Sequence, residues 1–284
     1  MAHDTKDNGD YVEAQVRRYD HDRYLTGLFA PPDLRPHLWA LYAFNAELAR
    51  VRETVSEPAM GEIRLQWWRD AVAAMAEGGQ VPHQPVAEAV AGAVRTGRLA
   101  VAELQRLIDA RLPELYDDIP RDRAAFEARH AAIDGEVTAM AARLLGAGDG
   151  EVAAAHAVGE AWGMVVTLRQ SARYAAMNRV RLPEDRMAAL GVTLQQLYKA
   201  GGSAGQKALL DEIAGIARAR LKAARTLMDG TPAQARSALL LAPLVRHDLK
   251  ALARARYDPS VDITRGGRPG RIFKLYWTAA RGRF

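Results

Sequence analysis

Residues 43–56 read AFNAELARVRETVS, and both the spacing of their apolar residues and their flanks are typical of a helix. A second helix is expected directly afterwards. There Ser56 can cap free amide groups, and Pro58 is tolerated in a first helical turn. Gly78 and Gly79 then end the helix. The region therefore predicts two consecutive helices with a short connection.

The second of these helices carries apolar side chains over a wide part of its circumference. They form two stripes at helical spacing, one of Met60, Ile63, Trp67, Ala71 and Ala74 and the other of Leu65, Trp68, Val72 and Met75. A helix with so broad an apolar arc is expected to be buried on most sides.

The helical period continues through most of the chain. Further helices are expected before Pro120 and over Phe126–Leu145, Glu151 to about Tyr174, 203–228 and 232–256, with a glycine-rich joint at Arg265–Pro269. The sequence has no useful run of alternating β-branched residues and no domain linker. We therefore expect eight or more helices in one all-α domain over residues 19–284, preceded by a polar segment over residues 1–18.

Composition excludes several classes of protein. The 284 residues are 49% hydrophobic and 26% charged and include no cysteine, so disulfides, thiolate metal sites and thiol nucleophiles are excluded. The longest apolar run, Ala238–Val245, contains Pro243 and is far shorter than the roughly 20 residues of a membrane-spanning helix. The first 13 residues are acidic, unlike a secretory signal or a mitochondrial presequence. We expect a cytoplasmic protein.

The net charge of +5 is concentrated at the C-terminal end. From Arg254 to Phe284 there are eight Lys or Arg against Asp258 and Asp262. This basic end also carries aromatic residues, namely Phe273, Tyr276 and Trp277. It suits an anionic lipid surface or a partner protein, and we do not expect nucleic acid. The alternative is a solvated terminal helix whose aromatic residues pack on the core. The first interpretation predicts a protein peripheral to the inner membrane.

Four motifs occur in a recognisable order. They are DRYLTGLFAPPDLRPHLWALYAF at 22–44, RLQWWRDAV at 64–72, PHQPVAEAV at 82–90 and GEAWGMVVTLRQSARYAAMNRVRLPED at 159–185. This pattern resembles the squalene/phytoene synthase family of head-to-head prenyl synthases, and the resemblance runs from about Tyr19 to the C-terminus. It implies a single-domain isoprenoid (terpenoid) synthase-like helical bundle around a central apolar pocket.

The resemblance also identifies where metal ligands would stand. Family enzymes ionise a prenyl diphosphate, and aspartates four residues apart on two helices hold the magnesium that neutralises the leaving group. Aligned through residues 40–44, the first pair of positions falls on Ala49 and Glu53; aligned through residues 178–183, the second falls on Gln170 and Tyr174. Only Glu53 keeps a carboxylate. We therefore expect no catalytic residue, no metal ligand and no cofactor, with Mg²⁺ relevant only if the chain is active.

Four arginines stand beside these positions, namely Arg50, Arg52, Arg169 and Arg173. Guanidinium groups pair bidentately with phosphate, so these side chains are candidates to bind a diphosphate or a phospholipid head group without metal. The alternative is that they form salt bridges with Glu47, Glu53 or other nearby carboxylates.

Other candidates have simpler explanations. Asp118 and Asp122 have the spacing of a metal pair, but Pro120 breaks the helical geometry, so Asp122 is expected to cap a helix. His130 and Asp134 are one turn apart and are expected to make a surface contact. Three aromatic residues are candidates either for a lipid pocket or for the core, namely Trp67, Trp68 and Trp162.

A narrower resemblance comes from AFNAELARVRETVSE, RLQWWRDAV and VPHQPVA, combined with the missing aspartates. Together they resemble the branch of the family represented by the mitochondrial complex I assembly factor with a squalene/phytoene synthase domain. This implies a bacterial homologue that helps to assemble NADH:quinone oxidoreductase without catalysis, with complex I subunits or assembly proteins as partners. Two alternatives stay open: an active prenyl transferase acting on prenyl diphosphates, and a basic protein that binds lipid or RNA.

Overall fold

The structure is a computed structural model that describes residues 2–198, 202–227, 235–263, 272–273 and 275–278. Within these residues every regular element is helical, as the sequence predicts. In chain order the elements are α1 (Ala2–Tyr19), α2 (His21–Gly27), α3 (Arg35–Thr54), α4 (Pro58–Ala76), α5 (Pro85–Arg95), α6 (Val101–Ala110), the 3₁₀ turn η1 (Leu112–Tyr116), α7 (Arg123–His130), the π-helical turn η2 (Ala131–Gly135), α8 (Glu136–Leu144), α9 (Asp149–Ala176), α10 (Glu184–Ala189), α11 (Leu194–Tyr198), α12 (Ala204–Thr226), α13 (Arg236–Leu239) and α14 (Leu241–Arg254).

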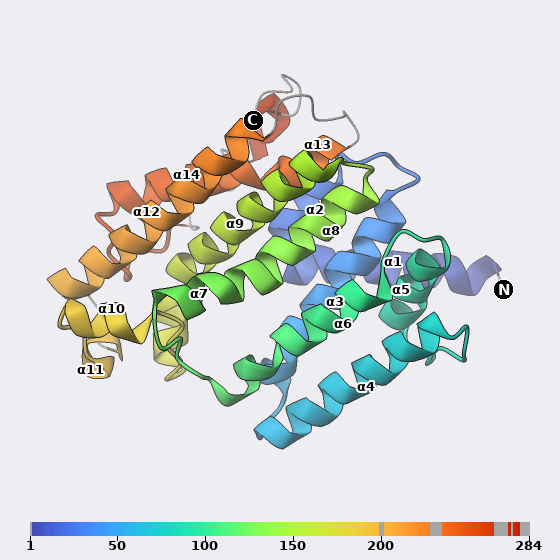
Figure 1. The fold of residues 1–284 in the computed structure, drawn as a ribbon, viewed down its shortest axis with the longest axis horizontal. Helices are drawn as coiled ribbons and strands as arrows, with labels where there is room; N and C mark the ends of the chain where they lie inside the picture. Colours follow the sequence, from blue (N-terminus) through green and yellow to red (C-terminus); the bar gives the residue numbers. More distant parts are fainter. Residues whose placement is uncertain (1, 199–201, 228–234, 264–271, 274, 279–284) are drawn as a thin grey trace.

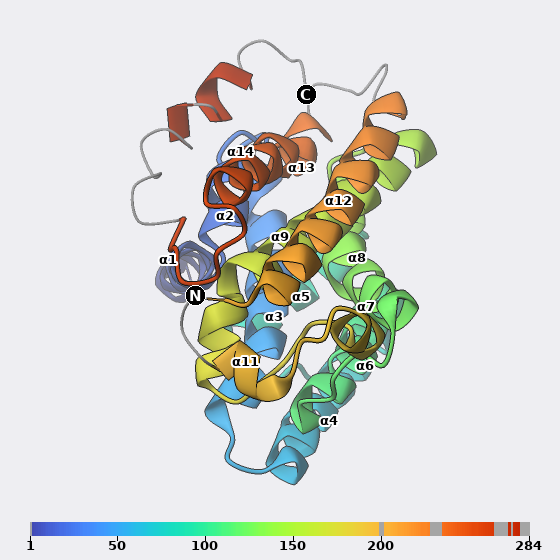
Figure 2. The same ribbon diagram turned by 90° about the vertical axis from the view of Figure 1, so that its left-hand side faces the viewer.

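The bundle is organised around α9, the longest helix. It packs against α8, α12 and α14, while α3 packs against α1, α5 and α8 (Figure 1). Turned by 90°, the ribbon shows α12 and α14 at one end of the molecule and α4 at the other (Figure 2). One continuous hydrophobic cluster runs through these helices, and Val12 and Val16 of α1 belong to it. α3 and α9 therefore stand in the interior of the bundle.

Several helix starts follow directly from local sequence. The Asp122 side chain accepts a hydrogen bond of 2.7 Å from the Ala125 amide and caps α7, so the predicted cap is confirmed. The corresponding expectation for Ser56 is wrong. α4 begins at Pro58 with Glu57 in the cap position, and no side chain caps it. Proline is enough there because its missing N–H is one of those that a first turn leaves unpaired.

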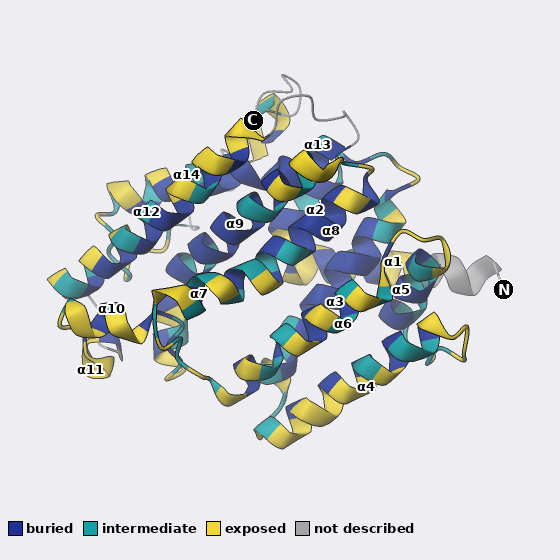
Figure 3. Ribbon diagram, viewed as in Figure 1, coloured by how far each residue is buried: buried dark blue, intermediate teal, exposed yellow. Residues whose placement is uncertain are grey.

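The expectation that α4 is buried on most sides is wrong. Leu65 and Trp68 face the core, but Met60, Ile63 and Trp67 are 53%, 63% and 40% exposed. α4 lies at the edge of the bundle, where no other helix of the described residues covers its outer side (Figure 3). Periodicity describes the helix surface but does not tell how many neighbours cover it.

The helix predicted over Phe126–Leu145 is not continuous. It begins earlier, at Arg123, and η2 interrupts it between α7 and α8. This π turn packs against α9 at Gly163, where an added Cβ would lie 1.9 Å from Asp134 Oδ2. A glycine is therefore required on α9 for the Asp134 side chain to take this position.

The C-terminal predictions are only partly covered. The described part of the helix expected over 232–256 consists of α13 and α14, with a break at Leu240. Residues 232–234 and the joint at Arg265–Pro269 lie outside the described residues, as do most of the terminal basic residues.

Candidate functional site: a basic cavity between two helices

A cavity of about 560 Å³ lies between α3 and α9. The end of α1, the start of α2, η1, the end of α7, η2 and the loop that carries Arg181 complete its walls. Eight of its lining residues are arginine and five are Asp or Glu. The resemblance implies an apolar pocket, whereas this one is strongly polar because its helices turn ion pairs toward it.

The four positions on which the family's metal-binding aspartates are expected to align, here called the motif positions, all line this cavity. Ala49 and Glu53 are on α3, and Gln170 and Tyr174 are on α9, so the structure brings the two predicted pairs to one place. Their chemistry differs from that of paired aspartates: one position has an apolar methyl, one an amide and one a phenol. The remaining carboxylate, on Glu53, lies 3.7 Å from Arg173 Nη2.

The four predicted anion-binding arginines do not act as one group. Arg50, Arg169 and Arg173 line the cavity, but Arg52 is not part of its lining. Each has a carboxylate partner: Arg50 with Glu47 at 3.8 Å, Arg52 with Asp117 at 2.5 Å, Arg169 with Asp248 at 2.7 Å and with Asp22 at 3.2 Å, and Arg173 with Glu53. These are the salt bridges of the alternative interpretation. Anion binding by these four stays a prediction.

The lining does not suit magnesium. Mg²⁺ requires carboxylate and water oxygens in near-octahedral geometry, but each carboxylate here already has an arginine or histidine partner. The pairs are Asp20 with Arg23, Asp22 with Arg169, Glu53 with Arg173, Glu114 with Arg111, Arg129 and Arg181, and Asp134 with His130. Among the residues that the structure describes, no group of three or more His, Asp or Glu side chains is placed to hold a metal ion.

His130 and Asp134 do not make the predicted surface contact. His130 is only 4% exposed, its Nδ1 lies 2.8 Å from Asp134 Oδ2, and both residues line the cavity. Burial raises the pKa of Asp134, but the hydrogen bond and charge of His130, together with Arg23 and Arg111, lower it below its ordinary value. The spacing identified the contact correctly, but η2 turns it inward.

The three candidate tryptophans have different positions. Trp162 lines the cavity, with the Arg23 guanidinium 4.0 Å from its ring and its Nε1 donating to Asp22 at 3.3 Å. Trp68 lies in the core, and Trp67 is exposed on α4. Trp162 therefore lines a pocket and Trp68 is a core residue, whereas neither of the two predicted positions describes Trp67.

The most concentrated charge in the cavity was not predicted. Three guanidinium groups surround Glu114: those of Arg111 at 3.0 Å, Arg129 at 2.6 Å and Arg181 at 3.8 Å. Burial raises the pKa of Glu114, but these three charges together lower it well below its ordinary value. The Arg111–Glu114 spacing was a weak signal in the sequence, and nothing local indicates that Arg129 and Arg181 join it.

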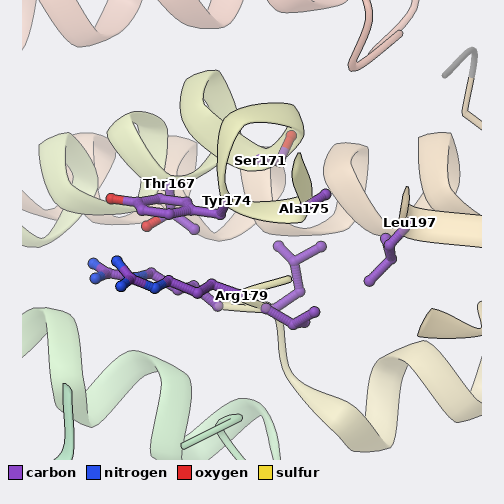
Figure 4. Close-up of a pocket in the computed structure, with 9 residues that line it drawn as sticks. Thr167, Ser171, Tyr174, Ala175, Arg179 and Leu197 are labelled. Atoms are coloured by element: carbon purple, nitrogen blue, oxygen red, sulfur yellow. The ribbon is translucent and has the colours of Figure 1, made fainter. Parts of the chain in front are cut away.

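A second, much smaller pocket of about 10 Å³ adjoins the cavity and shares Thr167, Tyr174 and Arg181 with it. Tyr174 and Thr167 extend to the same side of α9, and Arg179 runs beneath them (Figure 4). The Arg181 guanidinium stacks on the Tyr174 ring, 4.3 Å from its centre. Tyr174, one of the four motif positions expected from the alignment, therefore also holds one arginine of the Glu114 cluster.

Comparison with known proteins identifies a family and several relatives of similar sequence. A model of the squalene/phytoene synthase family matches residues 16–271. The chain is 32% identical over 250 residues to "NADH dehydrogenase (ubiquinone) complex I, assembly factor 6" of Mus musculus, covering 87% of this chain and 74% of that protein. The Homo sapiens protein is 30% identical over 250 residues, which again cover 87% of this chain and 74% of that protein. The homologue of Dictyostelium discoideum is 23% identical over 282 residues, 96% of this chain and 78% of that one.

Solved structures share the fold. A dehydrosqualene synthase in complex with ligand superposes with a TM-score of 0.83 at 20% identity, covering 99% of this chain and 98% of that one. The squalene synthase HpnC from Alicyclobacillus acidocaldarius has a TM-score of 0.79 at 18% identity, with 90% and 97% covered. The predicted isoprenoid synthase fold is thus confirmed.

Proposed function

The chain belongs to the squalene/phytoene synthase family, and on that premise we propose that it is a non-catalytic member that acts in assembly of respiratory complex I at the inner membrane. One observation carries the proposal. The four motif positions line one cavity, yet three of them bear no carboxylate and the fourth is paired with Arg173. The relatives named as complex I assembly factors support the cellular function. The proposed partners are complex I subunits or assembly proteins.

The alternative is an active head-to-head prenyl transferase that uses prenyl diphosphates and Mg²⁺. The observation that favours it is the retained cavity, with its basic walls, in a fold shared with a dehydrosqualene synthase. Such an enzyme would need metal ligands other than those at the four motif positions. Each carboxylate of the lining already has an arginine or histidine partner, which is why we place this function second.

The two functions make opposite predictions for purified protein. With Mg²⁺ and farnesyl or geranylgeranyl diphosphate, we expect no release of pyrophosphate, because the leaving group lacks the divalent cations that neutralise its charge. In cells, deletion of the gene is expected to remove assembled complex I, measured on native gels, and to leave isoprenoid lipids unchanged. The wild-type gene restores assembly. Pyrophosphate release that stops with chelator would instead support the prenyl transferase, and a deletion strain with normal complex I would contradict the assembly function.

Peripheral contact with the membrane is part of this proposal. In the part of the chain that the structure describes, no helix is both long and apolar enough to cross a bilayer. Phe273 and Trp277 stack on each other and are 68% and 51% exposed, whereas Leu275 is buried and Tyr276 meets Phe29 edge to face at 5.2 Å. Leu275 and Tyr276 thus attach this part of the chain to the bundle, while Phe273 and Trp277 expose aromatic surface. Exposed aromatic rings with basic residues nearby favour an anionic lipid surface.

We expect truncation after Asp262 to weaken pelleting with anionic liposomes, because it removes these aromatic residues and most of the terminal positive charge. The substitution Phe273→Ser is a sharper test, since Leu275 and Tyr276 keep their contacts. It should also reduce pelleting, measured by sedimentation with phosphatidylglycerol vesicles and with phosphatidylcholine vesicles as the control. Equal pelleting by wild type and both variants would remove the membrane contact from the proposal.

A further inference from the structure

Glu114 is shared by three arginines from different parts of the chain. Arg111 precedes it by three residues, Arg129 is at the end of α7, and Arg181 follows α9. Arg111 Nη2 also donates to Asn45 Oδ1 at 2.7 Å, but asparagine carries no charge. One carboxylate therefore contacts three positive charges, and among the residues that the structure describes no second carboxylate lies in direct contact with any of them, so two of the charges are left over.

The cluster is largely withdrawn from water. The exposed fractions of the side chains are 5% for Glu114, 8% for Arg111, 19% for Arg129 and 20% for Arg181. Excess charge in such a place is costly because solvent screens it poorly. Burial is indeed the main factor that lowers the pKa of Arg181, and the charges of Arg129 and Arg111 add to it despite the attraction of Glu114. The protein thus holds a positive charge where it is disfavoured.

Nearby acids do not supply the missing anions by contact. Asp134 is hydrogen-bonded to His130, and Asp20 is paired with Arg23 at 2.8 Å. Asp134 does attract Arg129 at longer range, so it offsets part of the excess. In addition, Arg111 Nε is buried without a hydrogen-bond partner. A donor and an excess of charge at one place both indicate an absent anion.

We propose that Arg111, Arg129 and Arg181 bind a phosphate group in the cavity without a metal ion. Phosphate suits the cluster because its oxygens accept the paired N–H groups of guanidinium, and a doubly charged group matches the two charges that Glu114 leaves over. All three arginines and Glu114 line the cavity, so a ligand there reaches them directly. The phosphate belongs either to a free phosphate or diphosphate or to a phospholipid head group. Trp162, Val166 and Ile133 of the same lining offer apolar contact to a lipid chain.

This inference names a ligand for the cavity of the proposed assembly protein but uses different arginines from those expected from the sequence. It also rests on the pairings and not on the family resemblance. Tyr174 supports it, since its ring holds the Arg181 guanidinium by stacking. Gly163 leaves room for the Asp134 side chain, whose direct hydrogen bond is with His130 and not with one of the three arginines.

The test is isothermal titration calorimetry of the full chain in EDTA with three probes: pyrophosphate, dihexanoyl phosphatidic acid and dihexanoyl phosphatidylcholine. We expect wild type to bind pyrophosphate, phosphatidic acid or both, and not phosphatidylcholine. Arg181→Gln should raise the Kd by about tenfold to a hundredfold, the loss of one charged hydrogen-bonding partner. The Kd of Arg181→Lys should lie between those of wild type and Arg181→Gln, because lysine keeps the positive charge but lacks the paired N–H groups of guanidinium. Arg121→Gln is the control, since its side chain is 86% exposed and outside the cavity.

The outcomes are distinguishable. Pyrophosphate binding identifies a free phosphate as ligand, and binding of phosphatidic acid alone identifies a lipid. No binding of either by wild type, or equal binding by wild type and Arg181→Gln in protein whose circular dichroism is native, overturns the inference. If Arg173→Gln alone weakens binding, the ligand is at the other end of the cavity and the inference is also overturned. Complex I assembly in the deletion strain is a separate measurement, so a failure here leaves the proposed function standing.

Discussion

Replacing Glu114 with glutamine is expected to lower the free energy of unfolding by about 3–5 kcal/mol, as for removal of one partner from a buried ion pair. The substitution keeps the shape of the side chain but leaves three buried guanidinium groups without their common carboxylate. Urea denaturation followed by circular dichroism measures the difference at neutral pH. A loss no larger than that of a surface substitution would contradict the charge arrangement described here.

The effect of Glu114→Gln on the free energy of unfolding is expected to depend on pH. Because the pKa of Glu114 is lower in the folded protein than its ordinary value of 4.5, the carboxylate stabilises the fold fully above that value. This stabilisation is lost as the pH falls toward the folded pKa. The gap between wild type and Glu114→Gln should therefore be largest near neutral pH and narrow below about pH 4.5. Glu212→Gln is the matched control: Glu212 pairs with Arg186 at the surface, so its loss should hardly move the unfolding midpoint at any pH.

Replacing Arg169 with methionine is expected to lower the free energy of unfolding by about 3 kcal/mol. Arg169 Nη1 contacts Asp248 of α14 at 2.7 Å and Asp22 of α2 at 3.2 Å, and all three side chains are at most 14% exposed. Methionine fills similar space, so the main effect is that two buried carboxylates lose the cation between them. We place the loss at the lower end of the usual range because Trp162 Nε1 still donates to Asp22.

Thermal unfolding and urea titration measure this loss, and Arg186→Met provides a comparison. Arg186 also makes two hydrogen bonds to one carboxylate, that of Glu212, but at the surface. Its replacement should leave the unfolding midpoint nearly unchanged. Equal effects of Arg169→Met and Arg186→Met would mean that the bridge between α9, α2 and α14 adds no more than a surface pair.

The fold was predictable because helical periodicity is a local property. The all-α class, the first turn of α4 at Pro58, the cap of α7 at Asp122 and the family pattern were all visible in short stretches. The predictions that were wrong are those that depend on how helices pack against one another. The apolar residues Met60 and Ile63 of α4 are exposed because no helix in the described part of the chain covers that side, and η2 interrupts an otherwise regular helical pattern.

The candidate site was predictable only in outline. Alignment located Ala49, Glu53, Gln170 and Tyr174, and the structure places all four in one cavity. The sequence named Glu47 and Glu53 as alternative partners of the nearby arginines, and Arg50 and Arg173 do pair with them. It did not indicate that Arg169 bridges to Asp248, 79 residues away. The contact between His130 and Asp134 was predicted by spacing, but its burial was not.

By itself the sequence determined the all-α class and the family to which the chain belongs, and it predicted that three of the four aligned motif positions bear no carboxylate. These follow from neighbours along the chain and from matching motifs. Only the tertiary structure decided that Arg111, Arg129 and Arg181 meet at Glu114, and that a cavity expected to be apolar is lined with ion pairs. The physical reason is that electrostatic partners are chosen by distance in space, and packing of α3, α7 and α9 sets those distances.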